Sequence, residues 1–109
     1  MKQEIFGARF SDDETKTGIR EVFDRYGYPL DPHGAVGYLG FAEYARITPG
    51  AHRGIVCETA HPAKFIEIME DVIPNAVTMP DQLAEVLKKE KSSVVLEASF
   101  EQLKSFLLS

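Results

Sequence analysis

The sequence predicts an α/β fold in which helices pack on a small, mostly parallel sheet, as a single domain over residues 1–109. Segments with helical periodicity alternate with short apolar runs rich in β-branched residues, in the order (β)ααβααβα. Long helical crossovers separate the runs, and such connections join parallel strands. At most three strands are available, which makes a small sheet, so we expect the chain to be one end of a larger protein.

The first two predicted helices have the clearest start signals. Ser11 and Glu14 match a capping box, and Gly27 is a left-handed stop after an apolar stripe. Asp31 followed by Pro32 is a good helix start, because Asp caps free N–H groups and Pro loses no hydrogen bond there. The second helix is apolar around most of its circumference, so we expect other elements to flank it.

Three shorter helices and the strands follow from weaker signals. One helix contains an apolar stripe from Phe65 and stops at Pro74, Pro80 opens the next, and Ser99 caps the last. The predicted strands are residues 54–59 and 93–98, with residues 4–10 as a further candidate. The single cysteine, Cys57, falls inside the first of these strands, where a buried and inert thiol is expected.

Composition narrows the function classes. A net charge of -5 without a basic stripe argues against a nucleic-acid partner. The apolar runs are too short to span a membrane, and the N-terminus lacks the apolar core of a signal peptide. With one cysteine no internal disulfide forms, which fits a cytoplasmic location. The spacing of histidines and cysteine matches no metal motif, so we expect no metal site.

The densest polar cluster is residues 58–65, Glu-Thr-Ala-His-Pro-Ala-Lys-Phe, where a predicted strand ends and a helix begins. Ligands of open α/β sheets sit at such strand ends, so Thr59 and His61 are candidates to meet a polar ligand. The alternative is that both side chains only cap the following helix, and spacing alone favours this interpretation. Nucleophilic catalysis by Cys57 with His61 as base is much less favoured.

A second cluster is residues 28–36, Tyr-Pro-Leu-Asp-Pro-His-Gly-Ala-Val. Its small residues at a helix start permit close approach of a ligand or another backbone. Taken alone, Asp31 and Pro32 need no function beyond starting the helix.

Three blocks taken together resemble one protein family. Residues 10–15, 27–38 and 58–65 are similar, in order and approximate spacing, to consecutive C-terminal signatures of threonine synthases. The likeness runs from about Phe10 to the end, and the combination of the second and third blocks is specific. Threonine synthases are much longer chains, so the resemblance implies a C-terminal portion whose partner is the remainder of a parent chain.

The resemblance implies a fold type II enzyme dependent on pyridoxal 5'-phosphate (PLP). Such a lyase converts O-phospho-L-homoserine and water to L-threonine and phosphate. In this family the pyridine nitrogen of the cofactor meets a neutral hydroxyl, and the matching residue is Thr59. His61 belongs to the same motif as a candidate cofactor-binding group, while Asp31, Pro32 and His33 match a helix start near the cofactor. Lys64 lies in the recognised block, at a helix start where a solvated or phosphate-facing role is expected.

Two departures from the family pattern bear on activity. The family usually has Thr where this chain has Gly34, so any hydroxyl contact at that position is absent. The lysine that forms the Schiff base belongs to an upstream motif, and none of the seven lysines of this chain lies in that context. The Gly-rich loop that holds the PLP phosphate is missing too. We therefore expect no catalytic lysine, no bound cofactor and no activity in this chain alone.

The alternative hypothesis is a free-standing α/β interaction or small-ligand-binding module without catalysis. If the rest of a larger sheet is removed, an unpaired strand edge or an apolar face is left exposed, so we expect a homodimer or larger oligomer of the isolated chain.

Overall fold

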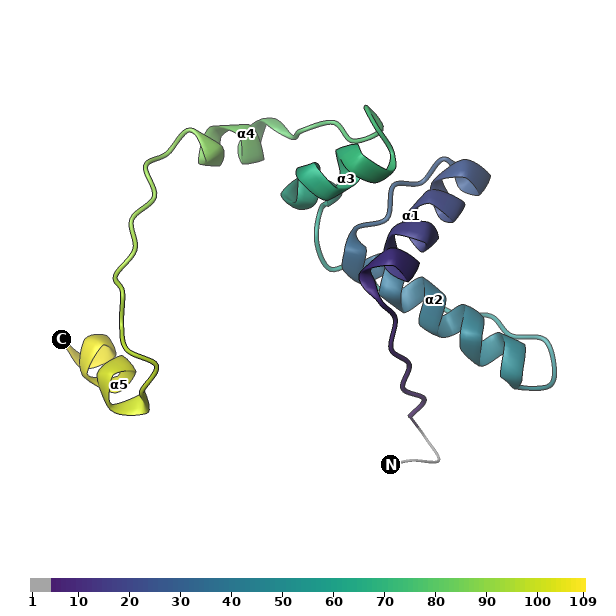
Figure 1. The fold of residues 1–109 in the computed structure, drawn as a ribbon, viewed down its shortest axis with the longest axis horizontal. Coiled ribbons are helices and arrows are strands. Elements are labelled where there is room, and N and C mark those ends of the chain that lie inside the picture. Colours follow the sequence, from purple (N-terminus) through teal and green to yellow (C-terminus); the bar gives the residue numbers. More distant parts are fainter. Residues whose placement is uncertain (1–4) are drawn as a thin grey trace.

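The computed structural model describes residues 5–109, and all regular secondary structure in this range is helical. The elements in chain order are α1 (Asp12–Tyr26), α2 (Pro32–Ile47), the 3-10 helix η1 (Pro62–Phe65), α3 (Ile66–Val72), α4 (Asp81–Leu87) and α5 (Phe100–Leu108), shown in Figure 1. No helix in this part of the chain combines the length and apolarity needed to cross a membrane.

The predicted caps of the two long helices are confirmed. The N–H of Glu14 donates to Ser11 Oγ at 3.3 Å and the N–H of Ser11 donates to Glu14 Oε2 at 2.7 Å, which completes the capping box of α1. Gly27 ends α1 in the left-handed region at φ 66°. Asp31 caps α2 by accepting a hydrogen bond from the N–H of His33 at 2.7 Å.

The three shorter helices also form where the sequence predicts them. The third begins as η1 and continues as α3, and the chain turns after it through Pro74 and Asn75, whose φ is 58°. Asn tolerates this left-handed conformation better than most residues. Pro80 precedes α4, and Ser99 Oγ accepts a hydrogen bond from the N–H of Gln102 at the start of α5.

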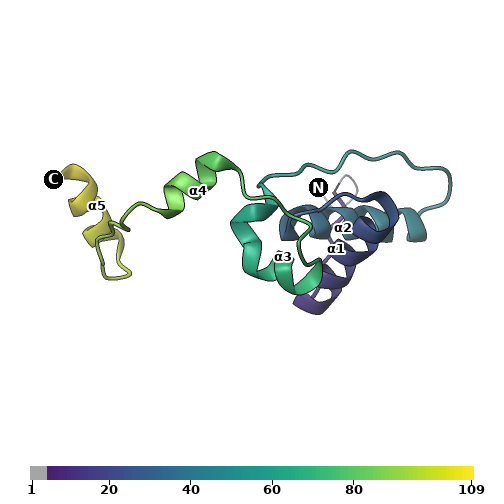
Figure 2. The ribbon, with the colours of Figure 1, turned by 90° about the horizontal axis from the view of Figure 1, so that it is seen from above.

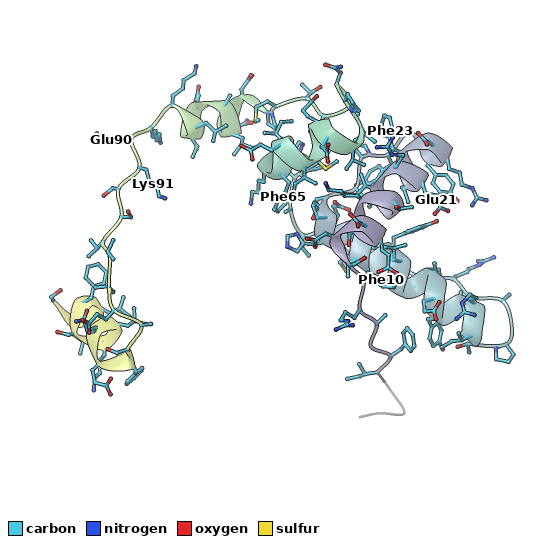
Figure 3. The ribbon with its side chains drawn as sticks, in the orientation of Figure 1. Phe10, Glu21, Phe23, Phe65, Glu90 and Lys91 are labelled. Carbon is cyan, nitrogen blue, oxygen red and sulfur yellow. The ribbon has the colours of Figure 1, made fainter. Side chains whose placement is uncertain are left out.

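Helices α1, α2 and α3 enclose a small hydrophobic core. α1 packs against both α2 and α3, and Figure 1 shows the three helices side by side. Phe23 of α1 and Phe65 at the end of η1 lie at the junction of these helices and pack on the edge of the core (Figure 3). The buried residues of the core are Ile19, Val22, Leu30, Ala35, Met69, Val72 and Ile73.

Helices α4 and α5 extend away from this three-helix unit, as both views show (Figures 1 and 2). The radius of gyration is 18.6 Å, whereas a compact domain of about this length has roughly 13 Å. Glu90 and Lys91 lie on the extended segment that joins the two helices (Figure 3). The α5 side chains Leu103, Phe106 and Leu107 are exposed.

The predicted sheet is wrong, because residues 5–109 contain no strand. Residues 54–59 and 93–98 lack regular secondary structure, and Ile55 and Val95 are 95% and 94% exposed. The third candidate begins at Glu4, outside the described residues, and its described part, residues 5–10, is not a strand. A strand needs a neighbour that accepts and donates its backbone hydrogen bonds, and no described segment supplies one.

Residues 54–58 instead lie along one face of α2, and we call residues 49–58 the return segment. Three residues of the segment approach α2 closely: Gly54 meets Phe41, Val56 meets Gly37, and Glu58 meets Gly34. Alternate residues of an extended chain share one face, and residues spaced by three and four share one helical stripe. Of the apolar residues in this segment, Val56 therefore packs on α2, whereas Ile55 and Cys57 point away from the helix and are exposed.

Truncation of a buried apolar side chain should lower the free energy of unfolding much more than truncation of an exposed one. Met69 is fully buried, so Met69→Ala should lower the free energy of unfolding by about 2–5 kcal/mol through the lost contacts and the cavity. Leu87→Ala, at a side chain that is 67% exposed, should change it by less than about 0.5 kcal/mol. Urea titrations followed by far-ultraviolet circular dichroism measure both values, and equal effects would contradict this core.

Candidate functional site

The return segment brings residues 58–61 back to the first turn of α2. The 16 residues of α2 rise about 24 Å at ~1.5 Å per residue. The ten residues 49–58 reach about 33 Å when extended, which is enough to run back along the whole helix. Figure 2 shows this segment leaving the end of α2 and returning to the start of α3. The two polar clusters of the sequence are thereby brought together.

Asp31 is the centre of the resulting polar network. Its side chain is fully buried, and its Oδ1 accepts hydrogen bonds from the N–H of His33 at 2.7 Å and from His33 Nδ1 at 2.9 Å. Its Oδ2 accepts a hydrogen bond from the N–H of Ala60 at 3.3 Å. A buried carboxylate requires such partners, because an unpaired one costs several kcal/mol. Asp31 therefore caps α2 and holds the loop after the return segment.

Glu58 completes the network from the other side. Its Oε1 accepts a hydrogen bond from the backbone N–H of Asp31 at 2.7 Å, and each of the two carboxyl groups shifts the pKa of the other. Burial raises the pKa of Glu58 above its ordinary value, and the neighbouring Asp31 carboxylate raises it further. Burial also acts to raise the pKa of Asp31, but hydrogen bonds from Glu58 and His33 outweigh it and hold the pKa of Asp31 below its ordinary value.

The pKa of Asp31 is lowered and that of Glu58 is raised, which distinguishes the two carboxyl groups of the pair. Asp31 is the group that stays ionised, since it accepts the larger number of hydrogen bonds. Glu58, whose pKa is raised, is the group of the pair that takes up a proton first as the pH falls.

Gly34 is buried in the first turn of α2 directly beside Glu58. A Cβ atom added at Gly34 would lie 2.8 Å from Glu58 Cδ, and still closer to Oε2. The backbone of α2 is helical here, so the glycine is needed for space rather than for an unusual conformation. The place that a side chain at position 34 would take is occupied by the Glu58 carboxyl group.

His33 is held in one orientation by two contacts. Asp31 is ionised and accepts, so His33 Nδ1 carries the proton that it donates. The His33 ring also meets the Phe65 ring edge-on, with 5.3 Å between centroids. This contact ties the start of α2 to the end of η1.

Thr59 and His61 lie on the loop that Asp31 holds, and both are exposed. The N–H of Ala63 donates to His61 Nδ1 at 3.1 Å, so the capping interpretation of His61 is confirmed, and Nε2 carries the proton of the neutral ring. Thr59 caps no helix, and its hydroxyl makes no hydrogen bond to any residue in the range 5–109.

A groove of about 470 Å³ opens beside this loop. Its walls include Tyr28 and Thr78 on one side and Glu58, Ala60 and His61 on the other. This volume lies within the ~300–1,000 Å³ of small-molecule sites. Thr59 lies between two of the lining residues in the sequence, but it does not itself line the groove.

The remaining candidate residues lie elsewhere. Pro32 lines a small pocket toward α1, together with Ile19 and Lys16. Lys64 is exposed and lines a different groove, between α3 and α4. The structure therefore brings the loop of Thr59 and His61 to Asp31 and His33, while the Pro32 ring between them faces α1 and Lys64 lies in a separate groove.

Sequence reasoning missed the role of Glu58 and misplaced Cys57. Cys57 is an exposed free thiol, not the buried one expected from an apolar strand, because the return segment turns only one face to α2. Among residues 5–109, no three His, Cys, Asp or Glu side chains form a group that could hold a metal ion.

The groups that the site offers to a polar ligand are uncharged hydrogen-bonding groups. It offers a neutral hydroxyl at Thr59, an imidazole N–H at His61 and a rigid loop pinned to a helix start.

Comparison with known proteins supports the family resemblance. The family described as "Threonine synthase, C-terminal" matches residues 34–107. A threonine synthase of Serratia marcescens is 34% identical over 106 residues, covering 97% of this chain and 24% of that protein. The enzymes of Escherichia coli K12 and of Buchnera aphidicola from Schizaphis graminum are each 32% identical, over 98% and 99% of this chain.

The chain spans about a quarter of the length of these relatives. No solved structure matches it significantly. Since the family match covers most of the chain and the relatives align along nearly all of it, the chain belongs to the threonine synthase family, in which it corresponds to the C-terminal region.

Proposed function

We propose that this chain supplies one wall of the cofactor site of a threonine synthase. The parent enzyme converts O-phospho-L-homoserine and water to L-threonine and phosphate with PLP as cofactor. The observation that carries the proposal is the Thr59 hydroxyl, which is exposed and without a hydrogen bond to residues 5–109, on a loop fixed by Asp31. A free hydroxyl on a fixed loop is suited to contact a group that other parts of the enzyme bring to it.

The residues present fit PLP at its pyridine nitrogen. The cofactor, when bound, supplies an electron sink for the carbanion chemistry of the amino-acid substrate. Thr59 offers a neutral partner to the ring nitrogen, which leaves that nitrogen less fully protonated than a carboxylate partner would. The adjacent groove is large enough for a small molecule.

The other candidate residues have supporting roles in this proposal. Asp31 holds the loop through the N–H of Ala60, and His33 braces Asp31. His61 caps η1 with one ring nitrogen and keeps the other for a polar contact, with no proton transfer assigned to it. Pro32 only starts α2, and Lys64 serves a solvated or phosphate-facing role in its separate groove.

The rest of the parent chain is the proposed partner of this region. It carries the lysine that binds the cofactor and the loop that holds the PLP phosphate, so this chain alone is inactive and binds no cofactor. The exposed apolar side chains of α5 fall at the helical spacing Leu103, Phe106 and Leu107, which is a face that another surface covers. A cytoplasmic location is part of the proposal, since the free thiol of Cys57 suits a reducing compartment.

A chimeric enzyme tests this function. The chain replaces the matching C-terminal region of Escherichia coli threonine synthase, and phosphate release from O-phospho-L-homoserine is measured. We expect the chimera to be active and Thr59→Val to lower kcat about 10- to 100-fold, because the ring nitrogen is left without its hydrogen-bond partner. Thr59→Ser keeps the hydroxyl and should retain most of the activity.

Two controls accompany the chimera. The truncated Escherichia coli enzyme without any C-terminal region should be inactive. Thr17→Val removes a hydroxyl from the exposed face of α1, where it bonds only to the Asp13 carbonyl oxygen, and should leave kcat unchanged. An inactive chimera would refute the proposed role, and so would a Thr59→Val chimera with the same kcat as the unmodified chimera.

The uncovered face of α5 makes a separate prediction for the isolated chain. Without the remainder of the enzyme we expect a homodimer or larger oligomer at tens of micromolar, roughly the range where weak pairing becomes visible. Multi-angle light scattering measures the mass, and Leu107→Glu should shift it toward the monomer, because it places a charge on the exposed α5 side chain. A monomer for the unmodified chain at this concentration would contradict the prediction.

A further inference from the structure

The loop that carries Thr59 is attached on both sides of that residue. Glu58, directly before it, accepts a hydrogen bond from the N–H of Asp31 at 2.7 Å. Ala60, directly after it, donates its N–H to Asp31 Oδ2 at 3.3 Å. Both attachments lead to Asp31, which is itself fixed as the cap of α2. Thr59 is thus the single residue between two anchored neighbours.

The first attachment depends on a space in α2. The Glu58 carboxyl group lies against Gly34, where a Cβ atom would come within 2.8 Å of Glu58 Cδ. Real Cβ atoms do not approach so closely, so a side chain at position 34 and the present position of Glu58 exclude each other. Other glycines of α2 differ in this respect, because a Cβ at Gly40 would meet nothing within 4 Å.

We propose that Glu58 is a positioning residue for Thr59, and that Gly34 is the complementary half of this device because its missing side chain makes room for the Glu58 carboxyl group. The inference rests on the proposed function for the importance of Thr59, but the device itself is a property of this chain. Its two halves lie 24 positions apart in the sequence and form one unit in space.

The hydrogen-bond chemistry of the pair supports this role. Glu58 accepts from the N–H of Asp31 with one oxygen, and the neighbouring Asp31 carboxylate raises the pKa of Glu58. Two acidic groups in contact hold each other only when they share a proton, and the raised pKa of Glu58 favours that state. Glutamine has the same shape, keeps the acceptor oxygen and supplies the proton permanently.

A mutant cycle in the 109-residue chain tests the complementarity. Gly34→Ala should lower the midpoint of thermal unfolding by about 4 °C or more, because the methyl group displaces the Glu58 carboxyl group. In a Glu58→Ala background the same change should raise the midpoint, since the space is then empty and Ala is a better helix former. Gly40→Ala is the matched control and should raise the midpoint in both backgrounds.

Amide hydrogen exchange measured by NMR tests the positioning. Glu58→Ala should speed exchange of the Ala60 N–H about tenfold or more, while amides of the core helices, such as that of Val22, change much less. Glu58→Gln should restore the Ala60 rate to within about threefold of the unmodified chain. A merely structural role of Glu58 would instead raise exchange rates throughout the three-helix unit.

The outcomes separate this inference from the proposed function. The cycle and the exchange rates are read without cofactor or substrate, so they stand even when the chimera is inactive. A fall of the midpoint on Gly34→Ala in both backgrounds would overturn the complementarity. Equal exchange rates for Glu58→Ala and Glu58→Gln would overturn the positioning role. In an active chimera, Glu58→Ala should lower kcat and Glu58→Gln should restore it.

Discussion

The close approach of the return segment to α2 is the constraint on which the candidate site depends. It returns the loop of Thr59 and His61 to the first turn of that helix, where hydrogen bonds to Asp31 and the contact of His33 with Phe65 hold the loop. The approach needs an extended segment as long as the helix, and it needs helix positions that are small where the segment passes. Gly34 and Gly37 supply those positions opposite Glu58 and Val56. A larger side chain at Gly34 would displace the Glu58 carboxyl group from its place beside Asp31, and the network would lose that contact.

That network turns a packing contact into a defined geometry. Apolar contact alone fixes the distance of the segment from the helix, but it leaves the segment free to slide. Hydrogen bonds to the buried Asp31 remove this freedom, because each has a preferred distance and direction. A buried carboxylate in this position resists movement, because any movement that breaks its hydrogen bonds leaves a buried charge unpaired, which costs free energy. The cap of α2 and the anchor of the loop are therefore the same side chain.

The helices were predictable because their signals are local. The capping box at Ser11, the Asp31 cap and the glycine at position 27 act within one turn, so the sequence contains the whole interaction. The sheet was not predictable from the same kind of information. The run from Gly54 to Thr59 has the composition of a strand, but composition states only that an extended backbone and an apolar neighbour are favoured. It does not say whether that neighbour is a strand or a helix, and here it is α2.

In the candidate site, too, the features encoded within a few residues were predictable, and the contacts between residues far apart in the sequence were not. The motif indicated Thr59 and His61, and the cap made by His61 was an alternative that spacing alone could suggest. Glu58 stands in the same motif, but its significance depends on Gly34, and neither residue indicates the other until the fold places them together. Glu58 is exposed, so the sequence alone does not require it to have a polar partner. Only the fold shows that its carboxyl group accepts the N–H of Asp31 and lies against Gly34, and neither contact is encoded within one helical turn.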